Sequence, residues 1–292
     1  MNDWERRGRT IAVIGTGEMG SGVGARLREM GARVLTTLKG RSAASAQRVK
    51  RAELEVIDDE DGLVCAAGFI LSIVPPGQAS AVADRFRAAL GRALEKPVFV
   101  ECNAISPPTV KRIAASLSPS ECPFIDAGII GGPPPPGRID KGPRIYASGP
   151  ESKLLLGLRK YGLDIVVIDG PIGAASGLKM AYAGLTKGMI ALGAAVVFGA
   201  SREGLASALH DELARSQPNL LSLLEARVPD MFRKAYRWVD EMGEIAEFLG
   251  SAGAGATIYE GAARLYAQIS ADQERFGEQA ESQRAVKTFL GS

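Results

Sequence analysis

The sequence predicts an α/β Rossmann domain, with a doubly wound and mostly parallel sheet, followed by an all-α C-terminal domain. A glycine-rich turn directly follows a short apolar run near the N-terminus, and strand and helix patterns alternate from there to about residue 169. Beyond that point the chain carries helix patterns without strand patterns. We therefore expect one domain in residues 1–169 and the other in residues 170–292.

The first domain opens with a β-α-β unit. Residues 11–14 form an apolar run that ends at the glycine turn, and helical spacing of apolar residues extends from Ser21 to Gly31. Residues 33–38 predict the second strand. Later strands are expected at 69–74, 97–101, 124–127, 144–147 and 165–168, and helices at 79–90 and 109–117.

The C-terminal part predicts two long helices. Residues 173–198 are rich in Ala, Gly, Leu and Met, and residues 229–249 carry apolar side chains at helical spacing. The longest apolar run, 189–200, is shorter than the roughly 20 residues that cross a bilayer, so a buried core helix is expected there. The prolines of 133–136 predict a stiff surface loop.

Composition argues against several classes of function. The net charge is +2 and the basic residues are scattered, so no nucleic-acid partner is expected. The three cysteines lie far apart and there is one histidine, so no metal site is expected. Separate thiols and a polar N-terminus without a signal-peptide pattern predict a cytoplasmic protein with no membrane partner.

The glycine turn has the sequence GTGEMG, which matches GxGxxG. Because it follows a strand and opens a helix, it predicts a dinucleotide site. Gly15 permits the tight turn, Gly17 lets the backbone approach a pyrophosphate, and Gly20 lets helix and strand pack closely. Glu18 and Met19 are expected at the cofactor with them, where the helix N-terminus favours phosphate. The alternative is a glycine turn that binds no ligand.

The end of the second strand predicts which dinucleotide binds. An NAD site places a carboxylate there for the ribose 2′-hydroxyl, and residues 36–42 contain none. Lys39 and Arg41 could hold a 2′-phosphate, and Ser42 could add a hydroxyl donor. We therefore expect NADP(H) as the cofactor. The alternative is a solvated loop, which often carries Lys and Arg.

Five segments occur in an informative order, namely 11–20, 72–75, 101–107, 126–132 and 173–179. They resemble five motifs of the 3-hydroxyacid dehydrogenase and 6-phosphogluconate dehydrogenase superfamily, in the same order. The first two are its opening IGxGxMG and the loop after its fourth strand. The other three are its D-x-S-T-x-S-P strand end, its D-A-P-V-S-G-G loop and the segment that carries its catalytic lysine. The resemblance implies that Val74 and Pro75 lie near the cofactor.

The resemblance also implies a catalytic role for Lys179. In the superfamily a lysine at this position lies beside the nicotinamide and the substrate hydroxyl. Hydride transfer from a C–OH group requires loss of the hydroxyl proton, and a lysine whose pKa is lowered can accept it. Lys179 would thus act as general base in oxidation and general acid in reduction. The alternative is a lysine whose ammonium group extends from the helix into solvent.

Other implied site residues depart from the family's usual types. Asn103 replaces a serine, and its amide could bind substrate or cofactor and take part in catalysis. Gly131 and Gly132 lie where the family has a serine-containing substrate loop, and could bind substrate through backbone N–H groups. Tyr182 lies one turn from Lys179, near the position of a usual asparagine, and could share in proton transfer.

The segment 234–239 resembles the short C-terminal helical domain of phosphogluconate dehydrogenase-like proteins. In relatives this domain helps to form a dimer and closes the substrate pocket. The resemblance therefore implies a homodimer, with Tyr236 and Arg237 in contact with substrate.

Taken together, the resemblance implies an NADP(H)-dependent oxidoreductase acting on a CH–OH group. Its small-molecule substrate would be a hydroxy acid or related alcohol, interconverted with its keto or semialdehyde form. Two alternatives stay open: reduction of imines on the same fold, and a regulatory nucleotide-binding protein without turnover.

Overall fold

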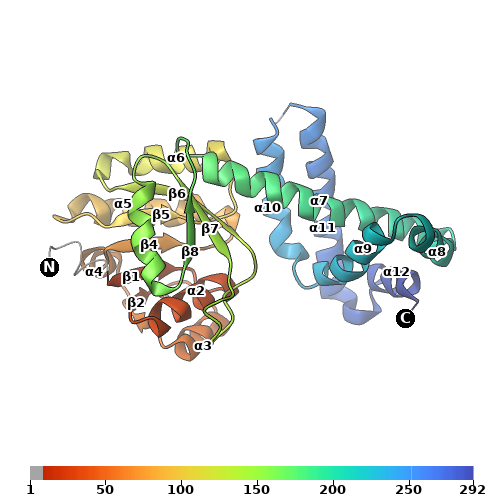
Figure 1. The fold of residues 1–292 in the computed structure, drawn as a ribbon, viewed down its shortest axis with the longest axis horizontal. Coiled ribbons are helices and arrows are strands. Elements are labelled where there is room, and N and C mark those ends of the chain that lie inside the picture. The colour runs from red at the N-terminus through yellow and green to blue at the C-terminus, as the bar shows by residue number, and fades with distance from the viewer. Residues whose placement is uncertain (1–8, 251, 292) are drawn as a thin grey trace. The chain divides into compact units, whose positions relative to one another are not determined.

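The structure is a computed structural model that describes residues 9–250 and 252–291 (Figure 1). The chain divides into two compact units, one extending to Met180 and the other beginning at Ala181. The first contains the sheet, and the second is helical. The predicted fold class, a Rossmann domain followed by an all-α region, is confirmed.

Within the described residues, one eight-stranded sheet has the order β3-β2-β1-β4-β5-β6-β7-β8. The strands are β1 (Thr10–Ile14), β2 (Arg33–Thr36), β3 (Glu55–Val56), β4 (Phe69–Ser72), β5 (Val98–Glu101), β6 (Phe124–Ile130), β7 (Arg144–Ser148) and β8 (Asp164–Val167). Neighbouring strands are parallel except for β6 and β7. Those two are joined by the loop 131–143 without a crossover helix, so they pair antiparallel.

Helices cover both faces of the sheet (Figure 1). Ile11 and Val13 of β1 belong to a core shared with helices α2 and α3, whereas Ala12 and Ile14 belong to a core shared with α4, α5 and α6. This alternation follows from the two-residue period of a strand. The helices are α2 (Glu18–Glu29), α3 (Ala43–Ala52), α4 (Glu60–Ala66), α5 (Ala79–Arg92) and α6 (Pro107–Leu117), with 3₁₀ segments η1 (Pro76–Gln78), η2 (Ser118–Ser120) and η3 (Ser152–Tyr161).

The second unit corrects one predicted helix. Residues 229–249 do not form a single helix, because the Lys234 N–H donates to the Met231 carbonyl at 2.8 Å and closes a turn. Pro229 lies inside the helix that precedes this turn. The helices are α7 (Ala174–Arg202), which begins in the first unit, α8 (Ala206–Ser216), α9 (Pro218–Met231), α10 (Ala235–Phe248), α11 (Ala254–Phe276) and α12 (Glu281–Leu290), with η4 (Gly277–Gln279).

The long helix α7 is less buried than predicted. The apolar run 189–200 is only part of this helix of 29 residues, which is long and apolar enough to cross a membrane. One such helix is weak evidence for a membrane protein, because the core helix of a soluble protein passes the same test. Only a third of its most apolar stretch is buried, so the expectation of a buried core helix is wrong for most of that stretch. The large apolar side chains that it exposes are Leu178, Tyr182, Leu185, Met189, Leu192 and Val196.

Candidate functional site

The turn between β1 and α2 has no room for a side chain at two of its three glycines and is open at the third. Gly15 has φ +97°, and a Cβ there would lie 2.2 Å from the Ile73 carbonyl oxygen. A Cβ at Gly20 would lie 1.8 Å from the Gly15 carbonyl oxygen. At Gly17, by contrast, a Cβ would meet no atom within 4 Å, so the start of α2 is accessible. An open helix N-terminus of this kind fits a dinucleotide pyrophosphate.

The carboxyl end of β2 carries the predicted phosphate-binding residues. Arg41 donates from Nη1 to Gln78 Oε1 at 3.1 Å, and Ser42 caps α3 by accepting from the Ser45 N–H. Burial, and then the nearby Arg85 guanidinium, lower the pKa of Arg41. Lys39 lies 3.7 Å from the carboxylate of Glu60.

Three further charged residues join this group through the fold. Arg85 pairs with Glu60 at 2.9 Å, and Arg48 donates from Nε to the Thr16 carbonyl oxygen at 2.9 Å. Sequence reasoning missed all three, because they come from α3, α4 and α5 rather than from the strand end. The group is electropositive, because it contains four cations and the one carboxylate of Glu60. The cations are Lys39, Arg41, Arg48 and Arg85.

Asn103 uses both ends of its side-chain amide within the protein. Oδ1 accepts from the Val74 N–H at 2.6 Å, and Nδ2 donates to Ser72 Oγ at 3.0 Å. Asn103 is 3% exposed, and its contacts hold the loop after β4 against the end of β5. The same loop packs against Gly15, whereas Pro75 beyond it is exposed. Asn103 therefore supports the glycine turn indirectly, through the loop after β4.

Asp126 in β6 connects the sheet to the start of α7. Its Oδ2 accepts from the N–H groups of Gly173, Ala175 and Ser176 at 2.8, 3.1 and 3.1 Å, and from Ser148 Oγ at 2.9 Å. Its Oδ1 accepts from Ser176 Oγ at 2.6 Å. The carboxylate is fully buried, and the helix N-terminus stabilises its charge. It fixes the first turn of α7 on the sheet.

Lys179 lies on α7 directly over β6. A Cβ at Gly128 would lie 3.0 Å from the Lys179 Cβ and 2.8 Å from the Ala175 carbonyl oxygen, so only glycine permits this approach. Lys179 is half-buried. Beyond Gly128, β6 leads into Gly131 and Gly132, which are both exposed; Gly131 has φ +123°. The fold thus brings the predicted lysine beside the strand that carries the predicted substrate loop.

Glu101 is a buried acid beside these groups. It is fully buried and lies opposite Asp126 in the register of β5 and β6. Its Oε1 accepts from the Asn103 N–H at 2.9 Å. Within the described part of the chain its Oε2 has no hydrogen-bond partner. Burial raises the pKa of Glu101 to about 8, and the charge of Asp126 adds to the rise. Burial also raises the pKa of the adjacent Cys102 thiol, which makes it unreactive.

The raised pKa of Glu101 predicts a pH-dependent stability. The carboxyl group ionises near 4.5 in the unfolded chain and near 8 in the fold, so stability falls as pH rises between these values and is level above 8. From pH 5 to pH 7.5 we expect the free energy of unfolding of the wild type to fall by about 3 kcal/mol more than that of Glu101→Gln. Urea denaturation measures both. Glu260→Gln, at an exposed site on α11, is the control. A constant difference between wild type and Glu101→Gln over this range would contradict the prediction.

The remaining predicted residues lie in the second unit. Tyr182 follows Lys179 by one turn of α7 and is 49% exposed. Tyr236 is 57% exposed on α10. Arg237 donates from Nε to Tyr236 Oη at 2.7 Å, and its guanidinium lies 5.3 Å from the ring centroid. Their roles at the site stay predictions.

Comparison with known proteins identifies the family. Residues 10–155 match the NAD-binding domain of 6-phosphogluconate dehydrogenase, and residues 200–269 match a domain of unknown function. An uncharacterised 28.5 kDa protein of Methanothermus fervidus is 29% identical over 240 residues, which cover 82% of this chain and 90% of that protein.

Solved structures of other proteins share the fold of this chain. A conserved protein of unknown function, described as structurally similar to 3-hydroxyacid dehydrogenases, has a TM-score of 0.64 and 29% identity, with 90% of this chain and 97% of that chain covered. The 3-hydroxyisobutyrate dehydrogenase of Mycobacterium tuberculosis, with L-serine, has a TM-score of 0.70 and 19% identity, with 96% and 98% covered, and so shares the fold. The chain therefore belongs to the 6-phosphogluconate dehydrogenase NAD-binding family, on a 3-hydroxyacid dehydrogenase-like fold.

Proposed function

We propose that this protein is an NADP(H)-dependent oxidoreductase that interconverts a hydroxy acid, or a related alcohol, with its keto or semialdehyde form. The position of Lys179 against Gly128 of β6, in the same compact unit as the glycine turn, carries the proposal. When bound, the nicotinamide ring accepts or supplies the hydride. The Lys179 amine takes the hydroxyl proton in oxidation and returns a proton to the carbonyl oxygen in reduction.

The cofactor would lie across the glycine turn. Gly17 leaves space for its pyrophosphate, and Gly15 and Gly20 permit the tight turn and its close packing. The groups proposed to surround it are Glu18, Met19, Val74, Pro75 and Asn103. The Asp126 contacts with the start of α7 hold this half-buried lysine over the sheet, where it could exchange a proton with the substrate.

We expect NADPH to bind at least about tenfold more tightly than NADH, because Lys39, Arg41 and Ser42 would bind the 2′-phosphate. The double variant Lys39→Ala/Arg41→Ala should lose most of this preference while NADH affinity stays level. Fluorescence titration measures both affinities. Arg87→Ala, at an exposed arginine on α5, should behave as wild type. A wild type that prefers NADH would disprove the assignment.

The substrate side is proposed to combine Lys179 with backbone N–H groups of Gly131 and Gly132. Tyr182 would share in proton transfer, and Tyr236 and Arg237 would bind substrate. A panel of hydroxy acids, aldehydes and imines tests the reaction class with NADPH and NADP+. Imine reduction is the second candidate, supported by Asn103 in place of the family's serine. NADPH binding without turnover of any panel member would favour a regulatory protein.

We also propose that residues 170–292 form a substrate and dimerisation domain of a cytoplasmic homodimer. The exposed apolar side chains of α7 recur at helical spacing, and uncharged apolar faces are typical of homodimer interfaces. Leu185→Glu/Leu192→Glu should therefore yield a monomer in light scattering after size exclusion. Leu94→Glu, at a fully exposed leucine outside this face, is the control. A monomeric wild type would refute the proposal.

A further inference from the structure

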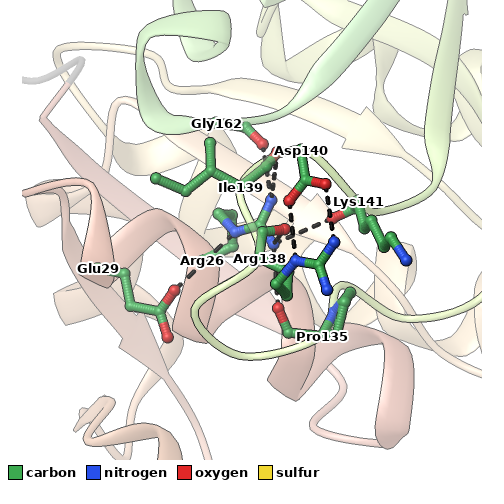
Figure 2. Close-up of polar contacts among 8 residues, drawn as sticks. All are labelled: Arg26, Glu29, Pro135, Arg138, Ile139, Asp140, Lys141 and Gly162. Carbon is green, nitrogen blue, oxygen red and sulfur yellow. Dashed lines mark hydrogen bonds and ion pairs between the residues drawn. The ribbon is translucent and has the colours of Figure 1, made fainter.

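Arg26 is a buried arginine on α2 that the proposed reaction does not use. It is 2% exposed, although arginine is rarely buried without partners. Its guanidinium faces the loop 131–143, which joins β6 and β7 (Figure 2). A charged group in this position needs several acceptors to offset the loss of water.

The loop supplies these acceptors from its backbone. Nη2 donates to the carbonyl oxygens of Pro135, Arg138 and Lys141 at 3.2, 2.7 and 3.1 Å. Nη1 donates to the carbonyl oxygens of Ile139 and Gly162 at 3.4 and 3.3 Å. Figure 2 shows the loop curving around the guanidinium so that its carbonyl oxygens converge on it, and Gly162, directly after η3, adds one more acceptor. One side chain thus binds four carbonyl groups of a segment that has no helix or strand of its own.

The same loop touches the start of α2. A Cβ at Gly22 would lie 3.1 Å from Pro134 Cδ and 3.2 Å from Pro133 Cβ, so the loop rests directly on the helix that follows the glycine turn. Pro134 is buried there, which corrects the prediction of a surface loop for this proline. Gly131 and Gly132 immediately precede this contact. They are held between the end of β6 on one side and the anchored segment on the other.

We propose that Arg26 is a positioning residue: it holds the loop 133–141 on α2 and thereby sets the Gly131–Gly132 backbone that receives the substrate. The proposal rests on the proposed function for its substrate step. Lysine could not replace arginine fully, because its single ammonium group has three donors and lacks the planar fork that spans several carbonyl groups.

Limited trypsin digestion tests the hold on the loop, because Arg138 and Lys141 are exposed trypsin sites whose own carbonyls bind Arg26. Arg26→Met keeps most of the stem and removes the donors. We expect it to raise cleavage after these two residues at least about tenfold. Arg26→Lys should be intermediate and also serves if the methionine variant does not fold. Arg28→Met, at a partly exposed arginine on the same helix, is the control and should match wild type.

Kinetics test the positioning of substrate. For Arg26→Met we expect the substrate KM to rise roughly tenfold, with kcat and NADPH affinity within about threefold of wild type. A general loss of structure would instead lower kcat and NADPH affinity as well. Cleavage at the wild-type rate, an unchanged KM despite a released loop, or a parallel loss of NADPH affinity would each overturn the proposal. A wild type that turns over no substrate, with the loop still released in Arg26→Met, would instead refute the oxidoreductase function and leave the hold on the loop supported.

Discussion

Replacing Lys179 by methionine is expected to lower kcat by about a thousandfold while NADPH binds with unchanged affinity. The methionine keeps the stem that packs over Gly128 and removes the amine that exchanges a proton with the substrate. The proposed phosphate-binding residues, Lys39 and Arg41, are untouched. Steady-state kinetics with the best substrate of the panel and a fluorescence titration with NADPH measure the two effects separately.

The matched control for this experiment is Lys111→Met. Lys111 is an exposed lysine on α6, and its Cε lies 3.1 Å from where a Cβ would stand on Gly173, just before α7 begins. It therefore reports on loss of a lysine near the same helix without loss of the proposed proton carrier. Undiminished turnover in Lys179→Met would exclude the proton-transfer role. Loss of NADPH binding in that variant would show that Lys179 serves the cofactor instead.

Replacing Asp126 by alanine is expected to lower the free energy of unfolding by about 3 kcal/mol. The substitution leaves the N–H groups of Gly173 and Ser176 buried without their acceptor, whereas the Ala175 N–H keeps Ser148 Oγ at 2.9 Å. It also removes the negative charge from the helix N-terminus. Urea denaturation followed by circular dichroism measures the loss. Because Asp126 also seats the first turn of α7, kcat should fall with stability.

Asp59→Ala provides the comparison, because Asp59 also caps a helix. It accepts from the Gly62 N–H at 2.6 Å at the start of α4, but the bond is exposed, so water can replace it. We expect a loss of about 1 kcal/mol there. Equal losses in the two variants would show that burial of Asp126 adds nothing to its contribution.

The local features of this protein could be predicted from its sequence. A tight turn needs glycine at Gly15 whatever lies elsewhere, and a strand or helix shows its period within a few residues. The order of the motifs was sufficient to identify the family, and the matching family model confirms it. The broken pattern at 232–234 was missed, because apolar residues keep a helical spacing across the turn between α9 and α10.

The long-range contacts could not be predicted from the sequence. Asn103 contacts Ser72 and Val74, Asp126 contacts the start of α7, and Arg26 contacts a loop more than a hundred residues away. The local sequence pattern around these residues does not indicate which residues they contact. Glu60 is the clearest case, since a carboxylate absent from the strand end reaches the proposed phosphate site from α4.

The sequence by itself determined the Rossmann fold, the helical C-terminal part and the place of the glycine turn, because each depends on residue period or on sterics within a few neighbours. Only the tertiary structure decided that Lys179 lies over Gly128, that Glu101 is fully buried opposite Asp126, and that Arg26 binds the loop after β6. These features depend on which segments pack together, and burial and hydrogen bonding are properties of that packing rather than of the residue alone.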